Sequence, residues 1–156
     1  MLELALPTRR DTVRLGAAIA RALRPGDLLT LEGGLGAGKT FLVRALCRAL
    51  GVEGEHRITS PTFTLVHEYQ ARHGQRVLHT DLYRLRGAND PAREITDLDL
   101  RSARLGGDIV LAEWPQGFEP YLGGDADLRV HLELAEKGRL ATLSGPRSSE
   151  ISLEKA

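Results

Sequence analysis

Apolar positions in the first third of the chain predict two strands that alternate with two helices. Residues 2–6 alternate apolar and polar side chains with a period of two, which is typical of an edge strand, and Pro7 ends it. After Thr8, with Asp11 three residues on as a variant capping box, the spacing of the apolar positions becomes helical. The buried face of this predicted helix carries Leu15, Ala18, Ile19, Ala22 and Leu23. A short apolar run at residues 28–32 predicts a buried strand, and residues 41–50 predict a second helix.

The remaining pattern predicts a mixed sheet with a further helix. Two alternating segments, residues 63–69 and 76–80, flank a polar turn at residues 72–75 and predict an antiparallel hairpin. Asp90 caps a helix whose first residue is Pro91, and we expect this helix to run to about Arg104. Residues 109–112 predict a buried strand, and residues 128–134 and 140–143 predict a final antiparallel pair. We therefore expect a single α/β domain over residues 1–145, followed by a polar tail at residues 146–156.

Composition and charge narrow the class of protein. The chain has 156 residues, 42% of them hydrophobic and 27% charged, with a formal net charge of zero. Because nucleic-acid binding depends on neutralising phosphates, this balance argues against a large nucleic-acid footprint. Because Cys47 is the only cysteine, no intramolecular disulfide can form. We expect Cys47 to be a small core residue. Without a secretory pattern at the N-terminus or an apolar run of membrane length, we expect a cytoplasmic protein.

The strongest motif begins directly after the strand at residues 28–32. Residues 33–40 read Gly-Gly-Leu-Gly-Ala-Gly-Lys-Thr and fit the phosphate-binding loop G-x-x-x-x-G-K-[ST]. Its glycines let backbone N–H groups face a β-phosphate, Lys39 reaches the β- and γ-phosphates, and the Thr40 hydroxyl binds Mg²⁺. A strand before the loop and a helix after it are the required context, so we expect a three-layer domain of the P-loop NTPase kind. The nucleotide-binding residues are then Gly34, Leu35, Gly36, Ala37, Gly38, Lys39, Thr40 and Phe41.

Two carboxylates stand where such a loop needs an acid. Glu113 follows the buried strand at residues 109–112, and Asp81 follows the second strand of the hairpin. Either one can hold the Mg²⁺ shell and orient the attacking group, and either can also be an exposed carboxylate or a helix cap. Thr62, in Thr-Ser-Pro-Thr, belongs to a nucleotide-sensing switch or to an ordinary turn, and spacing does not separate the two.

Trp114 and His79 lie near these acids in the sequence, and the role of each has two possible interpretations. Trp114 packs either against the nucleotide or in the core. His79 either tunes the site beside Asp81 or is a buried strand histidine with satisfied hydrogen bonds, which the pattern favours.

Missing elements exclude other classes of protein. No lysine lies between Lys39 and Lys137, so the guanine-reading Asn/Thr-Lys-x-Asp element is absent, and no aspartate is followed three residues later by glycine. Adenine is therefore the expected base. The histidines lack ligand spacing, which argues against zinc. Arg84 and Arg86 are candidates for a kinase lid, but no acceptor pocket accompanies them.

Four segments in series resemble one family. They are Gly36–Thr40, the Ser-Pro-Thr-Phe-Thr-Leu-Val-His-Glu-Tyr run at 60–69, His-Thr-Asp-Leu-Tyr-Arg-Leu at 79–85 and Glu-Trp-Pro at 113–115. In this order and spacing they are similar to TsaE (YjeE), the bacterial P-loop ATPase of tRNA threonylcarbamoyladenosine biosynthesis. The resemblance covers roughly residues 1–135. Two positions depart from it: Gly34, where the family often has an acidic residue, and Phe41, where it often has a small polar one.

The resemblance implies a protein that binds ATP and Mg²⁺, hydrolyses ATP slowly and acts with the TsaB–TsaD complex. Lys39 and Thr40 would hold phosphate and metal, and Asp81 and Glu113 would serve the metal and the attacking water. Thr62 would lie in the switch segment and Trp114 near the nucleotide. Contact with tRNA would be indirect, which agrees with the zero net charge, and the free protein would be a monomer. A small-molecule kinase and a nucleotide-gated binding module with incidental hydrolysis remain as alternatives.

Overall fold

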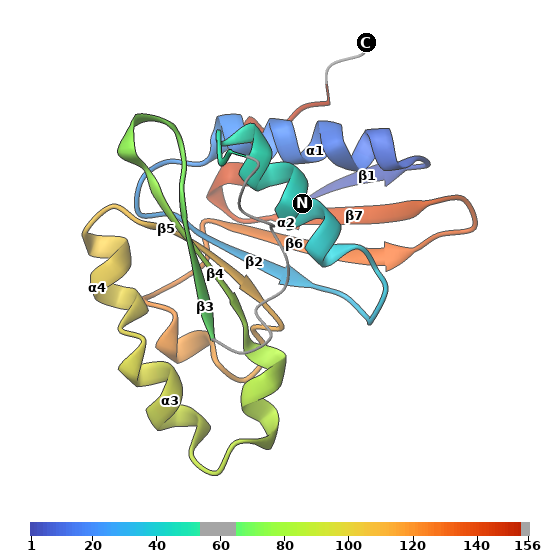
Figure 1. Ribbon diagram of the computed structural model, residues 1–156. Helices are drawn as coiled ribbons and strands as arrows, with labels where there is room; N and C mark the ends of the chain where they lie inside the picture. The colour runs from blue at the N-terminus through green and yellow to red at the C-terminus, as the bar shows by residue number, and fades with distance from the viewer. Residues whose placement is uncertain (54–64, 154–156) are drawn as a thin grey trace.

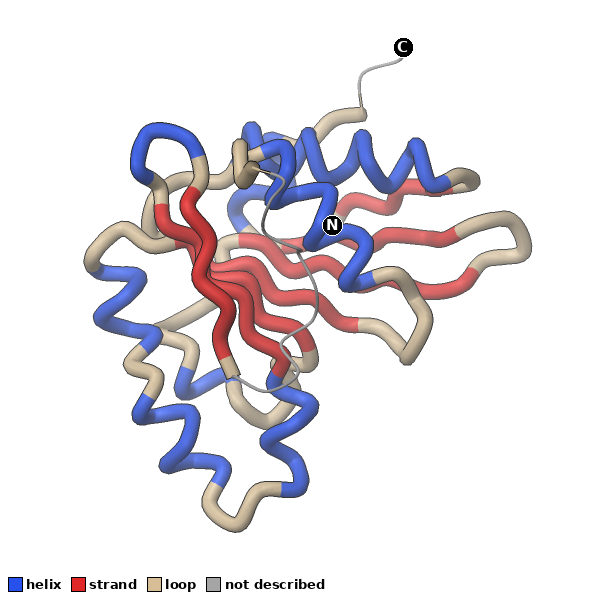
Figure 2. Tube along the Cα trace, viewed as in Figure 1, coloured by secondary structure: helices blue, strands red, loops and turns tan. Residues whose placement is uncertain are grey.

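A seven-stranded mixed sheet forms the middle layer of the protein (Figures 1 and 2). The computed structural model describes residues 1–53 and 65–153. The strand order across the sheet is β1-β7-β6-β2-β5-β4-β3. The strands are β1 Leu2–Leu6, β2 Leu28–Glu32, β3 Val66–Gln70, β4 Arg76–Asp81, β5 Ile109–Glu113, β6 Leu128–Leu134 and β7 Arg139–Ser144. The α-helices are α1 Arg9–Ala22, α2 Lys39–Ala49, α3 Pro91–Asp97 and α4 Leu100–Leu105.

The strand directions place the carboxyl ends of the central strands on the same side of the sheet. β2 runs parallel to both β5 and β6, and β5 runs parallel to β4. β3, β7 and β1 are antiparallel to their neighbours β4, β6 and β7. The predicted mixed sheet and its β3–β4 hairpin are therefore confirmed, although residues 63 and 64 lie outside the described residues. Because β2, β4 and β5 are parallel, their carboxyl ends meet at the same edge.

Helices cover the sheet on both faces and complete the predicted three layers (Figure 1). On one face α1 and α2 pack over a core that includes Leu29, Leu31 and Leu111. On the other, α3, α4 and the turn Leu82–Gly87 pack over Leu28 and Val110. α1 begins with the expected Thr8–Asp11 capping box. Gly16 brings α1 close to α2, since a Cβ there would lie 2.9 Å from the Cβ of Ala45.

The prediction of one continuous helix from Asp90 to about Arg104 is wrong, because the segment forms two helices. Asp90 and Pro91 start α3 as predicted, but the helix ends at Asp97 and α4 begins at Leu100. Between them Asp99 has a φ of 48°, in the left-handed region, and its side chain accepts a hydrogen bond from the Ser102 N–H. An aspartate that caps a new helix in this way competes with continuation of the old one.

The described part of the C-terminal tail packs on the domain. Residues Pro146–Glu150 form a 3₁₀ turn, and the Arg147 guanidinium donates to both carboxylate oxygens of Asp27 at 2.8 and 3.1 Å. Ile151 is buried against the α1 side of the core. The segment is thus polar in sequence but attached to the start of β2.

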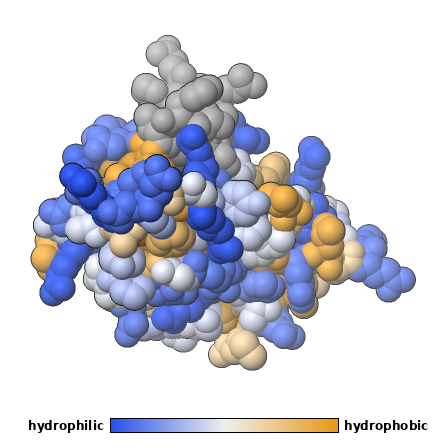
Figure 3. Space-filling model, turned by 90° about the horizontal axis from the view of Figure 1, so that it is seen from below, coloured by the Kyte–Doolittle hydropathy of each residue, from blue (hydrophilic) through white to orange (hydrophobic). Residues whose placement is uncertain are grey.

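The surface opposite this attachment is largely polar. Figure 3 shows the face that lies below in Figure 1, where apolar side chains form small patches separated by hydrophilic ones. Over the described residues, no helix combines the length and apolarity needed to cross a lipid bilayer.

Candidate functional site

The phosphate loop joins the end of β2 to the start of α2, as the motif predicts. Gly33, Gly36 and Gly38 have φ values of 143°, 76° and 106°, which favour glycine. Gly33 also approaches β6 closely, because a Cβ there would lie 2.3 Å from the carbonyl oxygen of Leu132. Gly34 has no such constraint, since a Cβ there would meet no atom within 4 Å. A larger side chain at Gly34 would therefore extend into open space.

Lys39 is buried at the base of the loop. Its Nζ donates to the carbonyl oxygens of Gly33 and Gly34 at 2.6 and 2.8 Å. Burial lowers the pKa of Lys39, while the nearby carboxylates Glu113 and Asp81 raise it. The lysine is therefore a partly desolvated cation on two neutral acceptors, which phosphate oxygens can replace with a stronger, charged interaction.

Thr40, Glu113 and Asp81 lie together beside Lys39. Glu113 ends β5 and Asp81 ends β4, and the two residues are register partners on these parallel strands. Thr40 Oγ1 donates to Glu113 Oε1 at 3.4 Å. Burial, followed by repulsion from Glu113, raises the pKa of Asp81. These residues line a cavity of about 270 Å³ together with Leu35, Gly36, Gly38, Lys39, Phe41 and Trp114.

The chemistry of this group of oxygens fits Mg²⁺. A hydroxyl and two carboxylates are hard oxygen ligands, and Mg²⁺ in nucleotide sites takes its other ligands from phosphates and water. Thr40, Glu113 and Asp81 are the three metal-shell residues that the sequence predicts, and the fold brings all three to one cavity.

Glu113 has a second partner below the cavity. His79 Nε2 lies 2.7 Å from Glu113 Oε2, and both side chains are buried, with 0% and 2% exposed. The predicted strand histidine with satisfied hydrogen bonds is wrong in its second part, because among the described residues His79 Nδ1 is buried and has no hydrogen-bond partner. His79 is a buried strand histidine, and it is connected to the site through Glu113.

Trp114 lies at the site rather than in the core. Its backbone φ of 57° turns the chain directly after β5. The Lys39 ammonium lies 4.2 Å from the centroid of the indole ring, and the Tyr83 ring packs on it at 4.9 Å between centroids. The Arg86 guanidinium lies 5.7 Å from the same centroid. Arg86, which the sequence offers as a lid candidate, therefore borders the site through Trp114.

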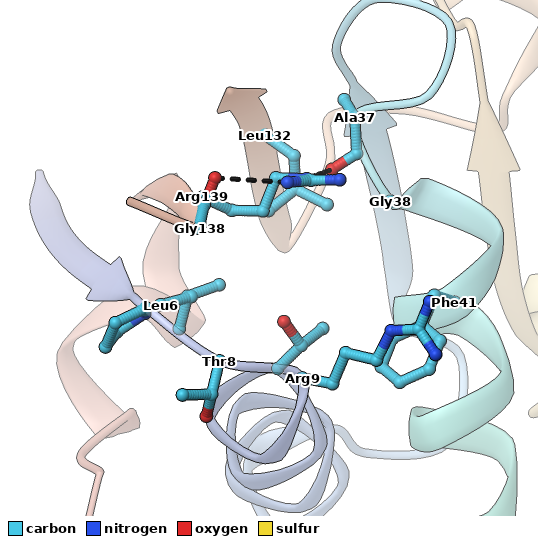
Figure 4. A pocket seen from close by; sticks show the side chains of 11 residues that line it. Leu6, Thr8, Arg9, Ala37, Gly38, Phe41, Leu132, Gly138 and Arg139 are labelled. Atoms are coloured by element: carbon cyan, nitrogen blue, oxygen red, sulfur yellow. Dashed lines mark hydrogen bonds between the residues drawn. The ribbon is translucent and has the colours of Figure 1, made fainter. Parts of the chain in front are cut away.

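A second cavity lies on the other side of the loop (Figure 4). It measures about 290 Å³ and shares Gly38 and Phe41 with the phosphate cavity. Phe41 projects into it from α2, and the Arg9 guanidinium lies 5.9 Å from the Phe41 ring. The other lining residues are Leu6, Pro7, Thr8, Thr12, Ala37, Leu132, Gly138 and Arg139.

Arg139 connects this second cavity to the loop. Its Nε donates to the Ala37 carbonyl oxygen at 2.9 Å, and its Nη2 to that of Gly36 at 3.3 Å. Sequence reasoning missed Arg139, Arg9 and Thr8 as site residues. The sequence marks Thr8 only as a helix cap and gives Arg9 and Arg139 no motif, because the pairing of β1 with β7 and of β7 with β6 is what brings the three to the loop. Thr62, predicted as a switch residue, lies outside the described residues.

Several known proteins have sequences similar to that of this chain. Residues 6–141 match the family model described as threonylcarbamoyl adenosine biosynthesis protein TsaE. The Aquifex aeolicus protein named tRNA threonylcarbamoyladenosine biosynthesis protein TsaE is 34% identical over 137 residues, 88% of this chain and 90% of that protein. The protein of the same name from Mycobacterium tuberculosis H37Rv is 37% identical over 148 residues, 92% of this chain and 86% of that protein.

A solved structure agrees with the sequence matches. The crystal structure of YdiB from Bacillus subtilis has a TM-score of 0.62 with this chain at 28% identity, over 91% of this chain and 82% of that one. With the family model matching most of its length, the chain belongs to the TsaE family of threonylcarbamoyl adenosine biosynthesis proteins.

Proposed function

We propose that this protein is a Mg²⁺-dependent ATPase that acts with the TsaB–TsaD complex in threonylcarbamoylation of tRNA adenosine. The observation that carries the proposal is the group formed by Lys39, Thr40, Asp81 and Glu113 around one cavity at the end of the phosphate loop. A lysine, a hydroxyl and two carboxylates in this arrangement match the needs of phosphoryl transfer to water.

Each side chain has a separate task. The loop backbone presents N–H groups to the β-phosphate, and Lys39 leaves the carbonyls of Gly33 and Gly34 to contact the β- and γ-phosphates. Thr40 and Glu113 would hold Mg²⁺, which when bound neutralises charge between the β- and γ-phosphates. Asp81 keeps its second carboxylate oxygen for the water, since Oδ1 accepts the Tyr83 N–H at 3.1 Å.

The second cavity supplies room for the nucleoside. It begins at Gly38 and Phe41, where the phosphate cavity ends, so one ligand can occupy both. Its aromatic and arginine side chains, Phe41, Arg9 and Arg139, can stack on a base. With the guanine-reading element absent from the sequence, adenine is the proposed base.

The pathway assignment rests on family membership. Relatives over nearly the whole chain carry the name of tRNA threonylcarbamoyladenosine biosynthesis, and we propose the same pathway for this protein. Zero net charge suits a protein that acts on TsaB–TsaD and contacts tRNA only indirectly. Hydrolysis would then reset its interaction with those partners.

Measurement of ATP turnover, by the protein alone and with TsaB–TsaD, tests the proposal. We expect slow turnover alone, an increase with the partners, and loss of both in Lys39→Ala and Glu113→Ala, each by about 100-fold or more. Lys137→Ala is the matched control, because Lys137 is exposed and lies outside both cavities. Normal repeated cycles of tRNA modification with Lys39→Ala or Glu113→Ala would refute the proposal.

The turnover and modification assays also distinguish two alternative functions. Turnover that ignores the partners but rises with a mixture of metabolites would indicate a small-molecule kinase. Modification that needs ATP binding but continues with a hydrolysis-dead variant would indicate a nucleotide-gated binding module.

A further inference from the structure

We propose that His79 is a positioning residue that orients Glu113 for metal binding. This inference rests on the proposed nucleotide and Mg²⁺ function of the site. Its structural basis is the buried contact between His79 Nε2 and Glu113 Oε2 at 2.7 Å.

Strand geometry explains how His79 reaches Glu113. His79 and Asp81 lie two residues apart on β4 and face the same side of the sheet, while Asp81 and Glu113 are register partners. His79 itself pairs with Leu111, so the imidazole lies two residue pairs before Glu113, on the same face of the neighbouring strand. From this position a long side chain reaches diagonally across to the carboxylate.

The two carboxylate oxygens of Glu113 have different hydrogen-bond partners. Oε2 accepts the Nε2–H of His79, and Oε1 accepts the hydroxyl of Thr40 at 3.4 Å. A carboxylate held at Oε2 cannot rotate freely, so Oε1 stays directed at the metal-binding hydroxyl. Partners of this kind orient metal ligands in many sites, and their loss typically weakens metal binding or activity.

Burial makes the hydrogen bond important for Glu113. The side chain is 2% exposed, so water offers little replacement for a lost partner of Oε2. Asp81, in contrast, is only partly buried and accepts a backbone N–H. His79 thus fixes Glu113 in a metal-shell position, whereas the partly exposed Asp81 is held by the Tyr83 N–H.

Two amide substitutions at one position test the contact. In His79→Gln the amide nitrogen takes the place of Nε2 and can still donate to Glu113. In His79→Asn the amide is one bond shorter and stops near the position of Nδ1. We expect His79→Asn to bind Mn²⁺ in the protein–ADP complex about tenfold more weakly than wild type, measured by electron paramagnetic resonance. We expect His79→Gln to stay within about threefold of wild type.

Turnover provides the second readout. The kcat for ATP should fall in His79→Asn and be largely restored in His79→Gln, with little change in KM. Val77→Ala is the stability control, since Val77 is buried on the same strand and the same face but lies outside the site. It should lower the melting temperature and leave Mn²⁺ affinity and kcat unchanged.

The outcomes distinguish this inference from the function on which it rests. Equal Mn²⁺ affinity in wild type and a folded His79→Asn overturns the positioning role, as does a parallel loss in His79→Gln and His79→Asn. A wild-type protein that binds Mn²⁺ with ADP but hydrolyses no ATP refutes the ATPase proposal, while the Mn²⁺ comparison still tests His79. Absence of any Mn²⁺ binding in the wild-type complex overturns the inference, because Glu113 would then have no metal to serve.

Discussion

The two sides of the phosphate loop are built in different ways. On one side, Asp81 and Glu113 end the neighbouring parallel strands β4 and β5, and Lys39 begins α2 after the loop that follows β2. On the other, the second cavity takes Arg9 from α1, Phe41 from α2 and Arg139 from β7. The first side follows from the loop motif and the ends of parallel strands, whereas the second exists only once the antiparallel strands β1 and β7 have joined the sheet.

The difference affects how charge is handled on each side. The strand-end side brings both signs of charge together, with two carboxylates in register and a lysine on neutral carbonyls. On the other side Arg139 donates to loop carbonyls, and Arg9 lies over an aromatic ring. We infer that the strand-end side is selected for chemistry and the second cavity for binding.

Gly33→Ala should have the largest effect, because it damages both sides together. Its Cβ would lie 2.3 Å from the carbonyl oxygen of Leu132 on β6, at a φ of 143°. The loop must then move away from β6, and we expect nucleotide affinity to fall by about 100-fold, with a cost of about 1–3 kcal/mol in the free energy of unfolding.

Gly34→Ala is the control for that change, since a Cβ at Gly34 meets no atom within 4 Å. Isothermal titration with ADP and urea denaturation should show it close to wild type. Equal losses in the two variants would contradict the close approach at Gly33.

The sequence predicts the strand-end side well and the second cavity poorly. Lys39 and Thr40 are marked by a local motif, and Asp81 and Glu113 by their places after apolar strands, so parallel pairing is enough to bring them together. Arg139 has no such mark. It lies about a hundred residues from the loop, and its role depends on which strands become neighbours.

A similar limit applies to the helix predicted from Asp90. Apolar spacing continues past Asp97, but the cap that Asp99 makes to Ser102 starts a new helix. Local hydrogen bonding of one aspartate decides this break, and periodicity does not show it.

Arg139→Leu should damage only the binding side. The change removes the hydrogen bonds to Ala37 and Gly36 and keeps an apolar side chain in the cavity. We expect ADP affinity to fall by about tenfold, because two charged hydrogen bonds are lost. At saturating ATP, kcat should change little. Arg129→Leu is the control, since Arg129 is exposed on β6 and lines neither cavity at the loop. A fall in kcat as large as the fall in affinity would show that the two sides are not separate.

Asp81→Asn should have the smallest effect, a small change in melting temperature. The direction of this change tests whether the Asp81 charge stabilises or destabilises the fold. Burial and Glu113 raise the pKa of Asp81, so the folded protein holds this proton more tightly than the unfolded chain does. The stability contributed by the proton is present at acid pH and is lost as the pH rises through the raised pKa. At pH 7 the ionised carboxylate therefore destabilises the nucleotide-free protein. An asparagine carries no charge and can still accept the Tyr83 N–H, so we expect a small rise in melting temperature at pH 7 that disappears near pH 4.

Asp108→Asn is the matched comparison for Asp81→Asn, because Asp108 accepts two hydrogen bonds from Arg76, at 2.9 and 2.7 Å. There the charge stabilises the fold, and the melting temperature at pH 7 should fall. Opposite signs in the two variants, measured by calorimetry without nucleotide, would show that the Asp81 carboxylate is kept at a cost in stability. A fall in both would place Asp81 among the structural carboxylates and leave Glu113 as the acid that function maintains.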